Sequence, residues 1–272
     1  MRIRVFHETK LSFPASARAL HLHLRMTPRS FDAQYVLRWR VETDLMTTLR
    51  PREDAFGSVV HALNWHKRIE TAVITASGEV ETNNRVGVVR GAVETLPPEM
   101  FLRASPLAHA NARLREFAQG VQGDDPLTRL HRLMETLRAH LTFAGGFGGE
   151  APAAEIFALA KGGAADYAHV FVACAREWGV PTRVVTGYRL GEAGPEMHAW
   201  AEAFTPGLGW VAFDAVNDLC ADETYVRLAV GLDAKDAAPL RVWTNAGDAT
   251  VDARLSVELA GAPGQSQSQS QS

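Results

Sequence analysis

The sequence is poor in cysteine and has no long apolar run. Cys174 and Cys220 are its only cysteines, which excludes a framework of several disulfides and a zinc site built on cysteine pairs. No apolar stretch approaches the roughly 18 residues of a membrane-spanning helix, and the alternating first residues are unlike a signal peptide. We therefore expect a cytoplasmic protein with no membrane partner.

The chain also lacks a strong excess of charge. Its formal net charge is −3 at pH 7, too small to indicate a nucleic-acid partner. Hydrophobic residues make up 46% of the 272 residues and charged residues 22%, which is typical of a globular protein with a sizeable core. The composition therefore points toward a folded protein that acts on, or binds, something other than nucleic acid.

Residues 1–95 predict a β domain. Short runs of alternating polar and apolar residues, such as 2–13 and 69–82, are separated by turn residues, as in half-buried strands. The segment "DAFGS" (54–58) is a candidate hairpin turn. His21 and His23 share one strand face, where a metal pair is possible, although no third ligand is evident and a polar strand face is the favoured interpretation.

The pattern becomes helical after the proline pair at 97–98, which marks the start of a core over 100–245. We expect one helix to begin at Ser105 and Pro106, and a second at the Asp125 cap with proline next to it. A further helix is expected from Ala164 to about residue 178, ended by Gly179. The predicted fold class is α+β, with a sandwich-like β domain followed by helices packed on an antiparallel sheet.

Three remaining segments have simpler interpretations. The glycine-rich run 143–150 lacks the order of a phosphate-binding loop and is expected to be a flexible loop beside a site. Residues 246–260 predict a C-terminal strand. The Gln/Ser repeat in 261–272 predicts a disordered tail.

The helix expected to begin at Ala164 would suit a nucleophile. A thiolate there would be stabilised by unpaired backbone N–H groups and the helix dipole, and the same N–H groups could hold an oxyanion. His198, as base, and Asp214, as the carboxylate that orients it, follow in later strands. Only the nucleophile is missing, because position 164 is alanine.

Four ordered motifs carry a family resemblance: "GGAADYAH" (162–169), "GVPTRVVTGY" (179–188), "HAWAEAF" (198–204) and "GLGWVAFDAVND" (207–218). With the N-terminal "RIRVFHETKLSF", they resemble the bacterial transglutaminase-like proteins of the papain-like and transglutaminase superfamily. The resemblance implies that Ala164 stands at the nucleophilic cysteine, with His198 as general base and Asp214 as its partner. It implies neither a metal nor an organic cofactor.

The resemblance also implies further residues near the site: Gly163, Asp166, His169, Tyr188 and Trp200. Asp166 and His169, three residues apart on one helix face, could pair with each other. Bracing of the helix is the favoured role for both. Tyr188 and Trp200 are candidate walls of a substrate groove, and Trp200 would lie on the same strand face as His198.

Three functions fit these residues. The first is a thiol-dependent peptidase or amidase acting on peptide or isopeptide amides, inactive as written because an alanine cannot attack a carbonyl. Hydrolysis is preferred over acyl transfer. The second is a natural pseudoenzyme that binds a peptide or protein partner without cleaving it. The third, weaker, is proton-transfer chemistry by His198 and Asp214 with water alone. Cys174 reads as a buried apolar residue and Cys220 as a loop residue, so neither is expected to replace the thiol.

Overall fold

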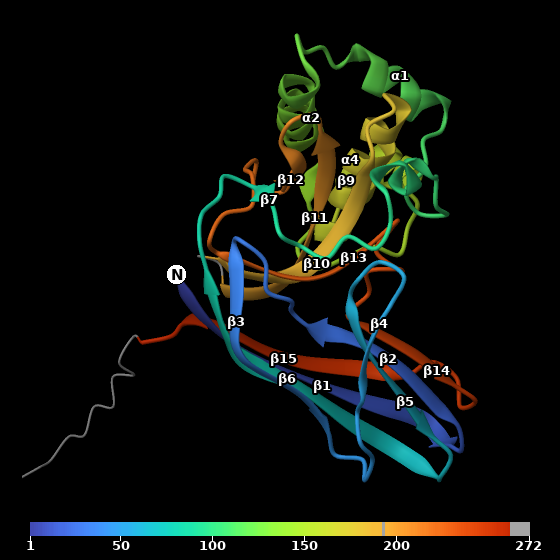
Figure 1. Cartoon of the computed structure of the whole chain (residues 1–272). Helices are drawn as coiled ribbons and strands as arrows, with labels where there is room; N and C mark the ends of the chain where they lie inside the picture. Colours follow the sequence, from blue (N-terminus) through green and yellow to red (C-terminus); the bar gives the residue numbers. More distant parts are fainter. Residues whose placement is uncertain (192–193, 262–272) are drawn as a thin grey trace, which may run out of the picture.

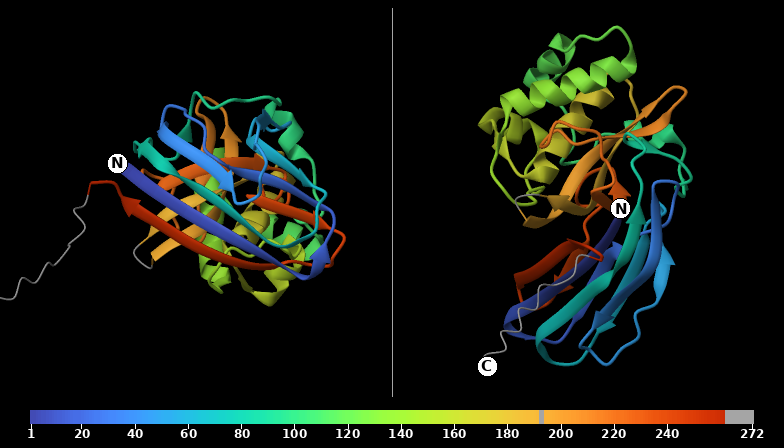
Figure 2. Two further views of the ribbon diagram at one scale, coloured as in Figure 1. Left: turned by 90° about the horizontal axis from the view of Figure 1, so that it is seen from below. Right: turned by 90° about the vertical axis from the view of Figure 1, so that its left-hand side faces the viewer.

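A computed structural model describes residues 1–191 and 194–261. Figure 1 shows two parts, one built from strands alone and one in which helices cover a sheet. The right-hand view of Figure 2 separates them along the length of the molecule, with the helices at one end. The expected α+β class is confirmed. The Gln/Ser tail lies, from residue 262, outside the described residues.

The strand-only part consists of two four-stranded antiparallel sheets. The order of the first is β15 (Thr250–Leu259), β1 (Arg2–Ala17), β6 (Ile69–Thr82) and β3 (Gln34–Thr43). The order of the second is β14 (Leu240–Thr244), β2 (Leu20–Thr27), β5 (Val59–Trp65) and β4 (Pro51–Glu53). Alternation explains the packing: in β1, Leu11 and its odd-numbered neighbours are buried, and Leu22 of β2 packs in the same core.

The turn predicted at "DAFGS" joins β4 to β5. The Oδ1 atom of Asp54 accepts hydrogen bonds from the backbone N–H groups of Phe56 and Ser58, each at 3.0 Å. Such side-chain bonds to the following backbone are the reason that aspartate favours turns. The prediction of a hairpin turn is confirmed.

Two strands depart from the expected boundaries. β14 lies within the expected core of 100–245 but pairs with β2, so by its hydrogen bonds it belongs to the strand-only part. β7 (Val88–Val89) lies within the expected β domain of 1–95 but pairs with β12 of the core sheet. Both pairings join segments that are far apart in sequence, so no local pattern could indicate them.

The core sheet has the order β13 (Tyr225–Gly231), β10 (Thr182–Gly191), β11 (Gly194–Thr205), β12 (Gly209–Phe213) and β7. A short helix η1 (Pro98–Leu102) follows β7, and β8 (Thr142–Phe143) pairs with β9 (Lys161–Gly162) in a small parallel sheet. In the core sheet all neighbours are antiparallel. This central sheet holds the site described below.

Among the described residues there are four α-helices, of which the first three pack on the fourth: α1 (Ala112–Gly120), α2 (Pro126–His140), α3 (Ala153–Leu159) and α4 (Ala164–Glu177). Helix α2 begins as predicted, because the Asp125 side chain accepts from the N–H of Thr128. The helix predicted from Ser105 is wrong at its start. Asn111 caps α1 instead, and Ser105 caps only a local turn by accepting from the N–H of Ala108.

Helix α4 packs against β10 and β11. Ala199, Ala201 and Ala203 point to this side of β11 and are buried with α4 in one apolar cluster. Their small side chains let the helix lie close to the sheet. Gly179, with φ of +71°, turns the chain after α4, in agreement with the predicted stop. No helix among the described residues combines the length and apolar character needed to cross a bilayer.

Candidate active site

Ala164 is the first residue of α4, and Gly163 is its N-cap. A helix of 14 residues is about 21 Å long, the length of six or seven strand residues. Because β10 follows α4 after a short turn and packs along it, the start of α4 lies at about the level of Gly187. Gly187 pairs with His198 of β11. Position 164 and His198 thus lie at about the same level along β10, although Ala199, and not His198, points to the α4 side of β11.

The Asp166 carboxylate joins the start of α4 to the glycine-rich loop of residues 143–150. Its Oδ1 accepts from the N–H of Gly149 at 2.8 Å, and its Oδ2 accepts from the N–H of Gly163 at 2.9 Å. The suggested pairing of Asp166 with His169 is therefore replaced by bonds to backbone. Asp166 braces the helix and the loop, which is the role that the sequence favoured.

The glycine-rich loop also covers the first amides of α4. The N–H of Ala164 donates to the carbonyl of Gly146 at 3.1 Å, and the N–H of Ala165 donates to the carbonyl of Phe147 at 2.7 Å. Ala164 itself is almost completely buried. The expectation that these amides are available for an oxyanion is wrong for this conformation, because the loop carbonyls already occupy them.

Two glycines make this close approach possible. Gly148 has φ of +66°, and a Cβ atom there would lie 2.3 Å from Oδ2 of Asp166. A Cβ atom on Gly163 would lie 2.8 Å from the backbone nitrogen of Gly148. Any side chain at either position would push the loop away from the helix, so glycine is required at both.

His198 and Asp214 form a fully buried pair, with 2.6 Å between Nε2 of His198 and Oδ2 of Asp214. β12 pairs with β11 only over Ala201–Thr205. His198 therefore lies beyond the last paired residue on that side, where Asp214 directly follows β12. The end of one strand thus leaves space beside its neighbour for an imidazole–carboxylate contact.

Asp214 is held by more groups than the sequence indicated. Oδ2 also accepts from the Tyr225 hydroxyl at 2.6 Å and from Nδ2 of Asn217 at 2.7 Å, while Oδ1 accepts from the N–H of Val216 at 2.9 Å. Burial alone would raise the pKa of Asp214, but His198 and the Tyr225 and Asn217 donors hold this pKa below its usual value. Asp214 is thereby kept as a carboxylate.

The ionised carboxylate of Asp214 also determines which nitrogen of the His198 ring carries the hydrogen. An ionised carboxylate only accepts hydrogen bonds, so Nε2 of His198 carries the hydrogen that points to Asp214. Nδ1 is then the nitrogen that can take up a proton. Tyr225 and Asn217 were not identified from the sequence. Asn217 had a signal, since it lies three residues after Asp214 in the turn, whereas Tyr225 comes from another strand and had none.

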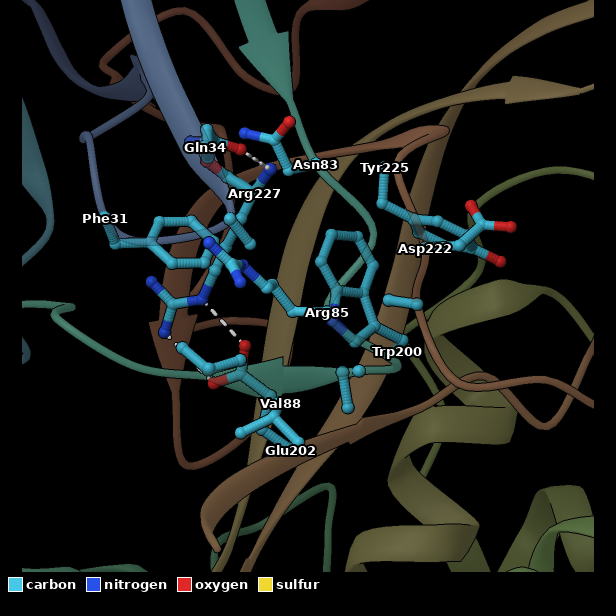
Figure 3. A pocket seen from close by; sticks show the side chains of 15 residues that line it. Phe31, Gln34, Asn83, Arg85, Val88, Trp200, Glu202, Asp222, Tyr225 and Arg227 are labelled. Carbon is cyan, nitrogen blue, oxygen red and sulfur yellow. Dashed lines mark hydrogen bonds and ion pairs between the residues drawn. The ribbon is translucent and has the colours of Figure 1, made fainter. Parts of the chain in front are cut away.

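Trp200 lies on the same strand face as His198, as expected. The two rings are stacked, with centroids 6.4 Å apart, and the Tyr225 ring lies 5.3 Å from Trp200. Figure 3 shows Trp200 and Tyr225 lining one side of a pocket of about 40 Å³, with Phe31 across from them. This volume suits one or two waters, and the Trp200 ring stacks on His198 beside the pocket.

The same pocket contains a buried ion network. Glu202 accepts from Nε of Arg227 and from Nε of Arg183, each at 2.7 Å, and Figure 3 shows the Arg227 contact. Burial opposes ionisation of Glu202, but the two guanidinium groups lower its pKa to about 2. This network fixes the position of the strands that carry Trp200 and Tyr225.

Tyr188 and His169 both lie away from solvent. Tyr188 is fully buried, and its hydroxyl lies 3.1 Å from Nδ1 of His7 in β1. It therefore joins the core to the strand-only part, and the expectation that it lines a groove is wrong. His169 accepts from the N–H of Ala234 at 3.0 Å through Nε2, and burial lowers its pKa to about 4.

Burial disfavours the thiolate form of both cysteines. Cys174 is fully buried within α4, and burial raises the pKa of its thiol. Burial also raises the pKa of Cys220 to about 11.

On β2, His21 and His23 have their Nε2 atoms 3.0 Å apart. Within 1–191 and 194–261, no three His, Cys, Asp or Glu residues gather as metal ligands would.

Comparisons with known proteins identify the family. Residues 115–215 match the transglutaminase-like superfamily, and residues 3–81 match the bacterial transglutaminase-like N-terminal region. An uncharacterised protein of Mycobacterium leprae is 28% identical over 270 residues, covering 92% of this chain and 96% of the relative. An uncharacterised Haemophilus influenzae protein is 24% identical over 249 residues, covering 77% of this chain and 66% of the relative.

Among solved structures, the crystal structure of a putative cysteine protease from Cytophaga hutchinsonii superposes with a TM-score of 0.78. The identity is 17%, and the match covers 95% of this chain and 90% of that one. At this identity the likeness concerns the fold, which both chains share across the strand-only part and the core.

Proposed function

The chain belongs to the transglutaminase-like superfamily, with the N-terminal region of the bacterial members, and from this premise we propose that it has the site of a thiol-dependent peptidase or amidase without its nucleophile. The buried His198–Asp214 contact of 2.6 Å carries the proposal. Ala164 stands at the nucleophile position, at the start of a helix. With alanine at position 164, the chain binds a peptide or isopeptide substrate and does not cleave it.

The proposed chemistry is that of a cysteine at 164. Its thiol proton passes to Nδ1 of His198, and the thiolate attacks the amide carbon. The imidazolium then protonates the leaving amine, which departs as the C–N bond breaks and leaves a thioester. Water, deprotonated by His198, attacks the thioester and releases the carboxylic acid and the thiol. Asp214 stabilises the imidazolium in both halves of the reaction.

The glycine-rich loop has a place in this proposal. The N–H of Ala164 donates to Gly146, so a substrate oxyanion would have to displace that carbonyl. A charged oxygen is a stronger acceptor than a neutral carbonyl, which favours the exchange once the tetrahedral intermediate forms. Loop movement is thus part of the proposed cycle.

The covered amides also favour a second candidate, a natural binding module. Ala164 is buried, and the loop closes over the two amides beside it. A protein that binds a peptide without turnover has no need of a free oxyanion site. The two candidates predict different behaviour for a cysteine placed at position 164.

The test is the Ala164→Cys protein. We expect iodoacetamide to alkylate the new thiol well below pH 8.5, the usual thiol pKa, and β-casein to be hydrolysed. Ala165→Cys, one residue along the helix, is the matched control and should show neither property. Ala164→Cys combined with His198→Ala should lose both. If the thiol at 164 titrates like a free cysteine and the variant hydrolyses nothing, the second candidate, the binding module, is supported instead.

We also propose a cytoplasmic location, which cell fractionation tests.

A further inference from the structure

A groove of about 840 Å³ lies between the strand-only part and the core. On one side it is lined by β14, the start of β15 and two residues of β1, and on the other by the glycine-rich loop and Met197 of β11. Figure 1 shows β14 and β15 in the lower part of the molecule, below β10 and β11. The groove is about twenty times larger than the pocket beside Trp200, which holds about 40 Å³.

Both strands at this groove are sheet edges. β15 pairs with β1 alone, and β14 pairs with β2 alone, among the described residues. The outer side of an edge strand presents backbone N–H and C=O groups that have no sheet partner. An extended peptide can pair with such an edge, taking its affinity from main-chain hydrogen bonds and its specificity from alternate side chains.

The inner face of β15 has apolar side chains that nothing covers. Val251 pairs with Leu11, and Ala253 pairs with Thr9, so both point to the side on which Leu11 and Thr9 are buried. Val251 is nevertheless 55% exposed, and Ala253 is also exposed. Further along the strand, Val257 is buried against the core. Val251 and Ala253 thus form an exposed apolar stretch of β15 at the groove, separated by Val257 from the exposed Leu259 at the far end of the strand.

The groove reaches the loop that covers the start of α4. Met197, which lines it, directly precedes His198. Phe147, which also lines it, accepts a hydrogen bond from the N–H of Ala165 at the start of α4. The charged residues of the wall are of both signs, Lys235 and Arg241 against Glu150 and Asp248. The lining therefore selects an extended chain with apolar side chains over a strongly charged one.

We propose that the strand-only part is the substrate-docking surface: an unfolded segment of a protein substrate pairs with the edge of β15, places apolar side chains on Val251 and Ala253, and runs under the glycine-rich loop to position 164. This inference rests on the proposed function for the identity of the occupant. It assigns to the N-terminal region the selection of extended over folded polypeptide.

Binding of fluorescein-labelled β-casein, a protein without a stable fold, to the full chain tests the docking surface. Because Ala164 prevents turnover, fluorescence anisotropy can measure equilibrium binding directly. Val251→Asp and Ala253→Asp should each weaken binding about tenfold or more, as expected at the centre of an interface. Thr250→Asp is the matched control. It adds the same charge beside Val251 on the opposite face of β15 and should bind as the unmodified chain does.

A second arm tests the strand pairing. A casein-derived peptide that binds should lose affinity when alternate backbone nitrogens are methylated, with the side chains unchanged. Equal binding of the Val251→Asp, Ala253→Asp and unmodified chains would overturn the proposal, as would no binding of casein to the unmodified chain. A dimer that Val251→Asp dissociates would also overturn it, because the occupant would then be a second copy of the chain.

The two proposals fail separately. If the Ala164→Cys thiol has an ordinary pKa but casein binding still depends on Val251, the chemistry fails and the docking surface stands. If that thiol is activated and Val251→Asp binds and hydrolyses casein normally, the docking surface fails and the chemistry stands.

Discussion

The Tyr225 hydroxyl donates to Oδ2 of Asp214 at 2.6 Å, the same oxygen that lies 2.6 Å from Nε2 of His198. One carboxylate oxygen therefore receives both contacts inside the protein. A hydrogen bond to the charged form of an acid lowers its pKa, so Tyr225 helps to keep Asp214 ionised where burial opposes it.

We predict that Tyr225→Phe impairs the Ala164→Cys enzyme mostly at low pH. Loss of the hydroxyl raises the pKa of Asp214, and a protonated Asp214 cannot stabilise the imidazolium. The acidic limb of the kcat/KM profile should move to higher pH, with a loss of about tenfold on that limb. Asp214→Asn, in the same background, should cost about 10²–10⁴-fold at all pH values. An unshifted profile for Tyr225→Phe would show that Tyr225 only fills space.

We predict that the unmodified chain does not react with iodoacetamide at neutral pH. Burial raises the pKa of Cys174, and it raises that of Cys220 to about 11, so almost no thiolate is present. Mass spectrometry should find both thiols intact in the native protein and alkylated in guanidinium chloride. Rapid labelling of Cys220 in the native state would identify it as an activated thiol and reopen its role.

We predict that His169 makes the protein less stable as the pH falls from about 6.5 to 4. Burial lowers its pKa to about 4, so the unfolded chain binds this proton at a pH where the folded chain does not. The stability that depends on a neutral His169 is present in full above pH 6.5. About 3 kcal/mol of the free energy of unfolding is lost by the time the pH has fallen below about 4. Urea unfolding at several pH values should show a flatter profile for His169→Gln. The exposed His66→Gln should leave the profile unchanged.

We predict that Glu202→Gln destabilises the fold by about 3–5 kcal/mol, because Arg227 would lose its carboxylate partner and the buried Arg183 would keep only that of Glu94. Glu135→Gln removes an exposed partner of Arg132 and should cost less than about 1 kcal/mol. Denaturant midpoints of the two variants measure the difference. Similar midpoints would mean that water replaces the Glu202 carboxylate.

We predict that Asp166→Ala releases the glycine-rich loop. The N–H groups of Gly149 and Gly163 would lose their acceptor, at a cost of about 1–3 kcal/mol. Limited proteolysis should cut within 143–150 faster than in the unmodified chain, with the cut sites identified by mass spectrometry. Asp166→Asn, which keeps one acceptor oxygen, should lie between the two. A loop that resists cleavage in both variants would show that the carbonyl bonds to α4 suffice.

Local signals predicted much of the fold. The caps of α2 and α4, the turn after Asp54 and the alternation of β1 each depend on a few neighbouring residues, and the structure has them where the sequence places them. The start of α1 was misplaced because Ser105 caps a single turn that does not continue as a helix. A cap residue shows where an N–H finds an acceptor, and not how far the helix runs beyond it.

Contacts between distant segments could not be predicted. Nothing around Tyr225 or His7 indicates that one bonds Asp214 and the other Tyr188. The occupied amide of Ala164 depends on how the loop folds over the helix. His198 and Asp214 were identified because their motifs are local and ordered, and their roles in catalysis stay predictions for the Ala164→Cys protein.

The pairing of β15 with β1 determines the order in which the chain can fold during synthesis. The core strands and helices, from β7 to β13, form one continuous segment between the two ends of the strand-only part. A ribosome delivers this segment whole, whereas β1 must wait, unpaired on one side, until β15 has been made. We expect the core to assemble first, and β1 to depend on chaperones or on β6 until the final strand arrives.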